Sequence, residues 1–199
     1  MTRFLLVRHA AVEMPENKIA GRAPDIHLTR TGREQAQQLV GALAREQIRA
    51  IYSSPRDRAR ETAQFIAEDR NLEVQIAAQL DELDYGEWTG ASMDELSGLP
   101  RWQAFNSVRS CTRIPQGEHI VEVQARVVAF IGDLGSRFPE TVSVLVSHAD
   151  VIRAALAYYL AFPLDFMLRV QISPASVSVV SFDRRGPSIL CVNHTGALQ

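Results

Sequence analysis

The chain has 199 residues, a length that suits one domain with a substantial buried core. Its hydrophobic content of 46% and charged content of 22% are ordinary for a globular protein. The net charge of −2 argues against a nucleic-acid-binding protein, which usually carries a basic face. No apolar segment approaches the roughly 18 residues that span a bilayer, and the apolar run after Arg3 is too short for a signal peptide. We therefore expect a cytoplasmic protein that binds neither nucleic acid nor membrane.

The first part of the chain alternates between predicted strands and helices. Apolar runs predict strands at residues 2–7, 50–53 and 74–77. Between the first two, Thr31 and Glu34 match a capping box, which predicts that a helix begins at Thr31. After the second strand, Ser54 is the expected N-cap of another helix, with Pro55 at its first position.

The segment 84–118 shows little periodicity and is long for a connection, so we interpret it as a functional insertion or lid. Its aromatic residues are more typical of a small core of that insertion than of a stacking platform; they are Trp88, Trp102 and Phe105. Its three arginines, Arg101, Arg109 and Arg113, would favour a substrate with a second negative group if they line the pocket. Solvent-facing arginines on a loop are an equally good interpretation.

The last third of the chain predicts a helix at 121–137, a strand at 141–147, and a helix at 150–160 capped by Asp150. Strands are expected at 167–172, 176–183 and 189–193. The turn Arg185-Gly186-Pro187 between the last two indicates an antiparallel hairpin at a sheet edge. The whole pattern predicts an α/β fold with a mixed sheet, and a homodimer through the hairpin edge stays open.

Two apolar runs end in a histidine, and these two positions point to the chemistry. The run 4–7 leads into Arg8 and His9, and the run 142–147 leads into His148. Open α/β sheets bind ligands beyond the carboxyl ends of their strands, so both imidazoles are expected at that edge. The guanidinium beside His9 and the helix start after His148 favour an anion there. Either histidine taken alone is more often structural than catalytic.

Arg58 supports the same prediction because it lies in the first turn of the second predicted helix, where free N–H groups favour anions. The alternative is a surface arginine paired with Asp57 or Glu61, and Glu82 taken alone would be a solvated acid. Two arginines would repel a divalent cation, and the five histidines include no His-x-His or His-x-x-x-His pair. The sequence therefore favours phosphate chemistry without a metal or other cofactor.

Five motifs in order make the chain similar to the histidine phosphatase superfamily, also called the phosphoglycerate mutase-like fold. They are 5–10 (LLVRHA), 28–36 (LTRTGREQA), 51–63 (IYSSPRDRARETA), Glu82 with 85–90 (YGEWTG), and 146–148 (VSH). The resemblance runs through most of the chain. It implies a single domain over residues 1–199, with three α/β/α layers and a mostly parallel mixed sheet flanked by helices.

The resemblance also implies roles for the matching residues. His9 would be the nucleophile that takes up the phosphoryl group, and Glu82 would protonate the leaving oxygen. Arg8, Arg58 and His148 would hold the phosphate.

The chain departs from the family pattern after the first histidine. Glycines usual in the family are replaced by Ala10 and Ala149, both small enough to keep the site. Residues 11–15 (AVEMP) lack a hydroxyl and an amide that often touch the substrate, which weighs against glycolytic mutase activity. Arg22, in the same loop, is a candidate for substrate contact, and a turn with a surface arginine is the alternative.

The expected function is that of a metal-independent phosphomonoesterase acting on a small phosphorylated metabolite through a phosphohistidine on His9. A phosphomutase of the same fold is the alternative, disfavoured because such mutases tend to be longer. A non-catalytic phospho-ligand-binding module is a third option, disfavoured because all five chemical groups are present. Cys111 and Cys191 have no metal-like or redox-like spacing and are expected to be free thiols.

Overall fold

The computed structural model describes residues 1–14 and 17–198, and its strands form one six-stranded sheet. The strands are β1 (Thr2–Arg8), β2 (Ile48–Ser53), β3 (Val74–Ile76), β4 (Val142–Ser147), β5 (Val177–Asp183) and β6 (Gly186–His194). Their order in the sheet is β3-β2-β4-β1-β5-β6. The strands β3, β2, β4 and β1 are parallel to one another, and β5 and β6 are antiparallel to their neighbours. The predicted α/β fold with a mostly parallel mixed sheet is confirmed.

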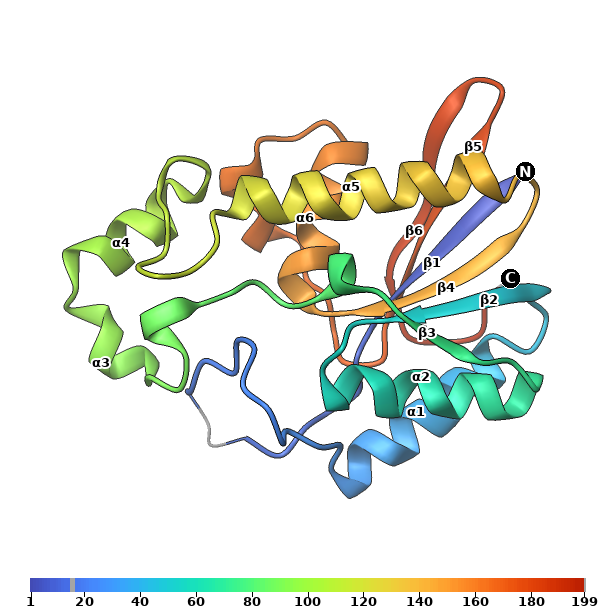
Figure 1. Cartoon of the computed structure of the whole chain (residues 1–199), viewed down its shortest axis with the longest axis horizontal. Helices are drawn as coiled ribbons and strands as arrows, with labels where there is room; N and C mark the ends of the chain where they lie inside the picture. Colours follow the sequence, from blue (N-terminus) through green and yellow to red (C-terminus); the bar gives the residue numbers. More distant parts are fainter. Residues whose placement is uncertain (15–16, 199) are drawn as a thin grey trace.

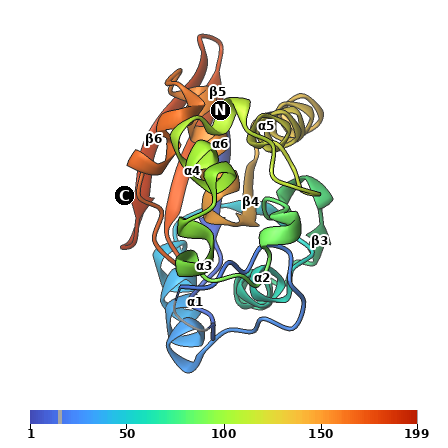
Figure 2. The same cartoon turned by 90° about the vertical axis from the view of Figure 1, so that its left-hand side faces the viewer.

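Helices cover both faces of the sheet (Figure 1 and Figure 2). The longer ones are α1 (Arg30–Ala42), α2 (Asp57–Arg70), α5 (Ile120–Arg137) and α6 (Ala149–Tyr159). Alternate residues of β1 face opposite layers: Leu5 and Val7 pack with α1 and α2, while Phe4 and Leu6 pack with α5 and α6. A continuous apolar run is therefore what a strand buried on both faces requires, and three layers result.

The segment between β3 and α5 contains short helices. They are η1 (Ala78–Leu80), η2 (Gly86–Trp88), α3 (Met93–Ser97), α4 (Pro100–Ser107) and η3 (Arg109–Cys111). Figure 1 shows α3 and α4 beyond the carboxyl ends of β1 and β4. The rings of Trp88, Trp102 and Phe105 pack together with centroids 5.2 to 6.0 Å apart, which gives the insertion a small aromatic core.

The base of the insertion closes tightly at Gly86. This residue has φ +46°, and a Cβ built there would lie 2.1 Å from the carbonyl oxygen of Pro115. Only glycine tolerates both the left-handed backbone and so close an approach. The Gly86 position therefore brings the two ends of the segment 84–118 together.

Three predicted helix caps were wrong. The N-cap of α1 is Thr29, whose hydroxyl accepts from the N–H of Gly32; it is not Thr31. The helix α2 begins at Asp57 after the N-cap Arg56 and has no side-chain cap; the Ser54 hydroxyl accepts from the N–H of Arg56, outside the helix, at 3.3 Å. The backbone of His148 precedes α6, while Asp150 lies buried in the first turn. The spacing of capping and apolar residues in the sequence predicts a helix start to within a few residues. The residue that becomes the N-cap depends on the hydrogen bonds that each side chain makes in the fold.

The predicted strand at 167–172 was also wrong. Residues Leu164–Arg169 form the 3-10 helix η4 directly after Pro163. Leu164 and Met167 are its buried side chains, and a spacing of three residues suits a 3-10 turn, whereas a strand would bury every second residue.

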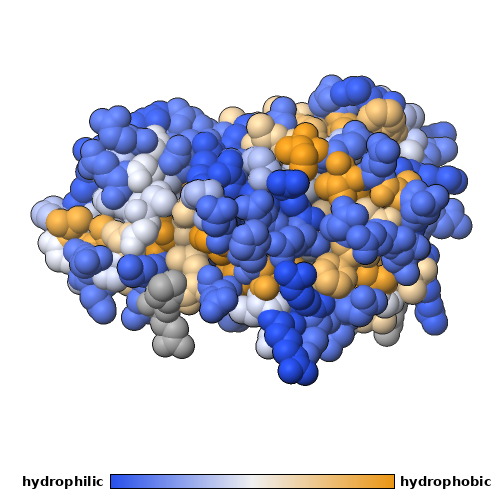
Figure 3. Space-filling view, turned by 60° about the horizontal axis from the view of Figure 1, so that its bottom comes forward, coloured by the Kyte–Doolittle hydropathy of each residue, from blue (hydrophilic) through white to orange (hydrophobic). Residues whose placement is uncertain are grey.

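The terminal hairpin is confirmed, since β5 and β6 pair antiparallel and β6 lies at the edge of the sheet. Leu190 and Val192 of β6 are exposed, and a homodimer through this edge stays a prediction. Cys111 and Cys191 are both free thiols. Hydrophilic side chains cover most of the face shown in Figure 3, with apolar patches between them. Among the described residues, no helix combines the length and apolar character needed to cross a membrane.

Candidate active site

The two histidines of the sequence motifs lie side by side at the end of the sheet. The parallel pairing of β1 with β4 sets Arg8 opposite Ser147, and His9 and His148 follow these residues directly. The backbone N–H of His9 donates to the carbonyl oxygen of Ser147 at 2.9 Å. The imidazole centroids are 5.2 Å apart with an angle of 59° between the rings. Strand register alone therefore brings together two residues separated by most of the chain.

The His9 ring is held so that one nitrogen remains free. Its Nδ1 lies 2.8 Å from the carbonyl oxygen of Ala10, which can only accept, so Nδ1 carries the proton and Nε2 carries the lone pair. The residue is 6% exposed. Burial, reinforced by the charges of Arg58 and Arg8, lowers the pKa of His9 to about 3. The imidazole is therefore neutral near physiological pH, with its unprotonated nitrogen available.

The loop after His9 is fixed to the two helices beneath it. The N–H of Ala10 donates to Oγ1 of Thr62 at 3.0 Å, and the Thr62 hydroxyl donates to the carbonyl oxygen of Arg58 at 2.7 Å. The start of α1 approaches so closely that a Cβ on Gly32 would lie 2.0 Å from the Ala11 carbonyl oxygen. The RTG and RAxxTA segments of the sequence thus position the loop that follows His9.

Two arginines whose charges act on His9 have buried side-chain nitrogens. Nη1 of Arg8 donates to the Ile172 carbonyl oxygen at 2.6 Å, and Nη2 of Arg58 donates to the Gly21 carbonyl oxygen at 2.8 Å. Within residues 1–14 and 17–198, Nε of Arg8 and both Nε and Nη1 of Arg58 have no hydrogen-bond partner. A buried donor left without a partner costs about 1–3 kcal/mol, and more when it is charged. An anion bound here would satisfy these donors.

His148 is completely buried beside Ser54. Its Nε2 lies 2.7 Å from Oγ of Ser54, and its Nδ1 lies 3.7 Å from Oε2 of Glu82. Burial, followed by the neighbouring His9, lowers the pKa of His148 well below its ordinary value. The contact with Ser54 was not anticipated, because the Ser-Pro pair matches a helix cap equally well in the sequence.

Glu82 lies next to these groups and has the properties of an acid that works near neutral pH. Its side chain is 13% exposed, and Oε1 accepts from the N–H of Leu83 at 2.9 Å. Burial raises its pKa from 4.5 to about 7; Asp150 adds to this effect, and Arg58 opposes it. The Ser147 hydroxyl donates to the Leu80 carbonyl oxygen at 2.7 Å, which ties the Glu82 segment to the end of β4.

Arg22 lies in a network of ion pairs. Its guanidinium is 2.8 Å from Glu118, 3.4 Å from Asp81 and 3.5 Å from Asp84. Its Nε also donates to the carbonyl oxygen of Glu82 at 2.8 Å. These contacts tie the loop that carries Arg22 to the segment that carries Glu82. Contact of Arg22 with a substrate stays a prediction.

Of the three arginines in the insertion, Arg109 is the one that is turned inward. Arg101 is exposed and donates to the Arg113 carbonyl oxygen, while Arg113 pairs with Glu122 on the surface. Arg109 is 4% exposed, and its Cζ lies 4.2 Å from the centroid of the Phe105 ring. Arg101 and Arg113 are therefore on the surface and Arg109 is buried; whether any of the three lines a substrate pocket stays a prediction.

Asp150 lies in a buried cluster next to Glu82. Its Oδ2 accepts from the hydroxyl of Tyr85 at 2.6 Å, and its Oδ1 lies 3.0 Å from Arg153. Although burial raises the pKa of Asp150, Arg109 and the Tyr85 hydroxyl lower it overall. The sequence singled out Asp150 only as a cap, because nothing in the spacing shows that Tyr85 approaches it.

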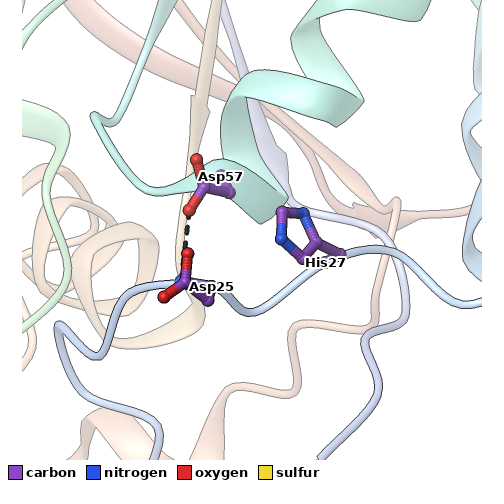
Figure 4. Close-up of side chains that lie close together, drawn as sticks. All are labelled: Asp25, His27 and Asp57. Atoms are coloured by element: carbon purple, nitrogen blue, oxygen red, sulfur yellow. Dashed lines mark hydrogen bonds between the residues drawn. The ribbon is translucent and has the colours of Figure 1, made fainter.

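A group with metal-ligand chemistry lies elsewhere, where the loop before α1 meets the start of α2. The side chains of Asp25, His27 and Asp57 point toward one another, with ligand atoms within 4.8 Å (Figure 4). These groups are already engaged: Asp57 accepts from the N–H of Asp25, and Nδ1 of His27 bonds to Glu61. That bond raises the pKa of His27, which favours the protonated imidazole over the neutral form that binds metals.

A family model described as the histidine phosphatase superfamily (branch 1) matches residues 4–195. The chain belongs to this superfamily. It is 32% identical to phosphoserine phosphatase 1 of Hydrogenobacter thermophilus, over 98% of this chain and 93% of the relative. It is 30% identical to a 2,3-bisphosphoglycerate-dependent phosphoglycerate mutase of Thermoplasma acidophilum, over 90% and 86% of the two chains.

A solved structure extends this likeness to the fold of the histidine phosphatases. The structure is that of a phosphoserine phosphatase mutant from Entamoeba histolytica in complex with phosphoserine. It matches with a TM-score of 0.88 and 28% identity, over 98% of each chain. The resemblance predicted from the five motifs is confirmed, and the chain is a member of an enzyme family that acts on phosphate esters.

Proposed function

We propose that this histidine phosphatase hydrolyses the monoester of a small phosphorylated metabolite through a phosphohistidine on His9, without a metal. The observation that carries the proposal is the set of buried nitrogens around His9 that lack partners in the described residues. They belong to Arg8, Arg58 and His148. Phosphoryl transfer depends mainly on positioning and on neutralising charge at the phosphate oxygens, and these groups are suited to both tasks.

In the first step, Nε2 of His9 attacks phosphorus, a nitrogen–phosphorus bond forms, and the bond from phosphorus to the ester oxygen breaks. Arg8, Arg58 and His148 bind the non-bridging oxygens throughout. Glu82 gives its proton to the departing oxygen, so that an alcohol leaves. A pKa of about 7 keeps a large share of Glu82 protonated near neutral pH.

In the second step, the Glu82 carboxylate takes a proton from water while the water oxygen attacks phosphorus. The bond from phosphorus to His9 breaks, inorganic phosphate leaves, and Glu82 is again protonated. The segment 84–118 belongs to the same domain in this proposal and covers the site as its lid. Support for this comes from Tyr85, at one end of the segment, which bonds to Asp150 beside the site.

The test uses p-nitrophenyl phosphate and phosphoserine as substrates in the presence of a chelator. We expect turnover, and we expect ³²P from a labelled ester to appear on the protein in an acid-labile form. His9→Asn should abolish both, whereas His27→Asn, a matched change at an exposed histidine, should preserve them. Turnover by His9→Asn at the wild-type rate would exclude the phosphohistidine route.

A phosphomutase is a second candidate, favoured by the mutase relative that covers 90% of the chain. In that case the phosphoryl group on His9 returns to a second substrate molecule before water attacks. Isomerisation of 3-phosphoglycerate, stimulated by a bisphosphate primer and faster than phosphate release, would establish the mutase. Tight phosphate binding without turnover of any ester would instead indicate a binding module.

A further inference from the structure

The Nε2 side of the His148 ring is linked to the carboxylate of Asp81 through the hydroxyl of Ser54. Nε2 of His148 lies 2.7 Å from Oγ of Ser54, and the Ser54 hydroxyl donates to Oδ1 of Asp81 at 3.3 Å. Ser54 and His148 are completely buried, and Asp81 is 6% exposed. The contact with Ser54 is the one hydrogen bond that the His148 ring makes within the described part of the chain.

The direction of these bonds determines where the imidazole proton lies. A carboxylate can only accept, and a hydroxyl has a single proton. With the Ser54 proton directed at Asp81, the Ser54 oxygen accepts from Nε2 of His148. In that arrangement neutral His148 is protonated at Nε2, and Nδ1, which has no partner among the described residues, is left on the side of Glu82.

Asp81 is held in place by charge on its other sides. Nε of Arg56 lies 2.9 Å from Oδ1, and Nε of Arg22 lies 3.4 Å from Oδ2. The N–H of Glu82 also donates to Oδ1 at 2.8 Å. The residue that anchors the chain of bonds to His148 therefore precedes the proposed acid directly and shares its backbone segment.

We propose that Ser54 and Asp81 are positioning residues that hold the His148 imidazole with Nδ1 directed at the bound phosphoryl group. The proposal rests on the proposed function of this site. Without Ser54 the buried ring could turn over or change tautomer, because nothing else described bonds to Nε2. When a phosphate dianion binds, Nδ1 takes up a proton from solvent, and the Ser54–Asp81 pair still accepts the Nε2 proton of the resulting cation.

The first test reads the tautomer of His148 in the free wild-type protein itself. Long-range ¹H–¹⁵N spectra of protein labelled at histidine distinguish a proton on Nε2 from one on Nδ1, and His148→Asn assigns the signals. We expect the Nε2-protonated tautomer, with both nitrogens protonated after addition of inorganic phosphate. Observation of the Nδ1-protonated tautomer in the free protein would overturn the proposal.

The second test compares Ser54→Ala with Ser53→Ala. Ser53 is the preceding residue and is equally buried, and among the described residues its hydroxyl bonds only to the Ser54 carbonyl oxygen, so the two changes are closely matched. We expect Ser54→Ala to give a mixture of His148 tautomers and to weaken inorganic phosphate binding about tenfold, the effect of losing one bond to a charged group. Ser53→Ala should match the wild type in both respects.

A third variant, Asp81→Asn, removes the negative charge of Asp81 but keeps an acceptor oxygen for the Ser54 hydroxyl. The amide in Asp81→Asn can still accept from Ser54, so the tautomer should persist while phosphate binding weakens several-fold. Asp84→Asn, which also removes a partner of Arg22, should leave phosphate binding unchanged.

Equal phosphate affinity in Ser54→Ala and Ser53→Ala would overturn the proposal even if the wild type is an active phosphatase. Wild-type protein that neither binds phosphate nor turns over esters would instead refute the proposed function, and the tautomer of the free protein would still report on Ser54.

Discussion

Replacement of Glu82 by glutamine should make the folded protein more stable at alkaline pH. Burial raises the pKa of Glu82 from 4.5 in the unfolded chain to about 7 in the fold. Between these values the folded state holds a proton that the unfolded state has released, so stability falls as pH rises. Glutamine keeps the shape and the acceptor oxygen for the Leu83 N–H, and it never ionises.

The magnitude follows from the two pKa values. Each pKa unit between the unfolded and folded values corresponds to about 1.4 kcal/mol. Because Glu82 loses its proton more readily in the unfolded chain, the free energy of unfolding should be lower than in acid by about 1 kcal/mol at pH 5 and about 3 kcal/mol at pH 8. The free energy of unfolding of Glu82→Gln, relative to that of the wild type, should therefore rise by about 2 kcal/mol from pH 5 to pH 8.

Urea unfolding at pH 5 and pH 8 measures this difference directly and requires no substrate. Glu73→Gln, the same change at an exposed position near the sheet edge, serves as the control and should show no such growth. If the free-energy difference between Glu82→Gln and the wild type is the same at both pH values, Glu82 is not the buried neutral acid described above. Its place in proton transfer would then lose its physical basis.

Three further predictions concern other groups. The pKa of His9 is lowered from 6.5 to about 3, so the unfolded chain takes up a proton that the folded protein does not. The contribution of His9 to the free energy of unfolding should therefore fall by about 2 kcal/mol from pH 8 to pH 5, and urea unfolding of His9→Asn should lack that loss. Arg58→Ala should weaken inorganic phosphate binding, measured by calorimetry, about a hundredfold because two charge-assisted bonds disappear. Arg60→Ala, a change at an exposed neighbour, should leave the phosphate affinity unchanged. Phe105→Ala should lower the free energy of unfolding by about 3–5 kcal/mol, with hydrogen exchange accelerated most in segment 84–118. Equal acceleration across the sheet would contradict a local role for Phe105 in the insertion.

Much of the fold could be predicted because buried parallel strands leave a strong local signal. The centres of β1 (residues 4–7) and β4 (residues 144–146) are apolar, since both faces of these strands are covered by helices. Residues 167–172 were mistaken for a strand, although 164–169 form a 3-10 helix, because so short a segment lacks the length to reveal its period. The buried side chains of that 3-10 helix, Leu164 and Met167, pack in the same cluster as helix α6, a contact that lies outside the local sequence.

The residue types of the candidate site were also predictable, but their hydrogen-bond partners were not. His9 and His148 follow apolar runs, so their location at the strand ends follows from local pattern. The partner of Ser54 could not be predicted, because a serine before proline satisfies a helix cap and a buried imidazole equally well. Only the packing of β2 beside β4 brings Ser54 within 2.7 Å of the ring.

The sequence alone determined the class of fold, the family and the five chemical groups, because apolar periodicity and motif order are properties of the chain itself. The tertiary structure alone decided how those groups are protonated and held. Burial raises the pKa of Glu82 and lowers that of His9, and Asp81 reaches His148 only through Ser54. Solvation and hydrogen-bond direction depend on neighbours that are distant in sequence, which is why residue spacing does not contain them.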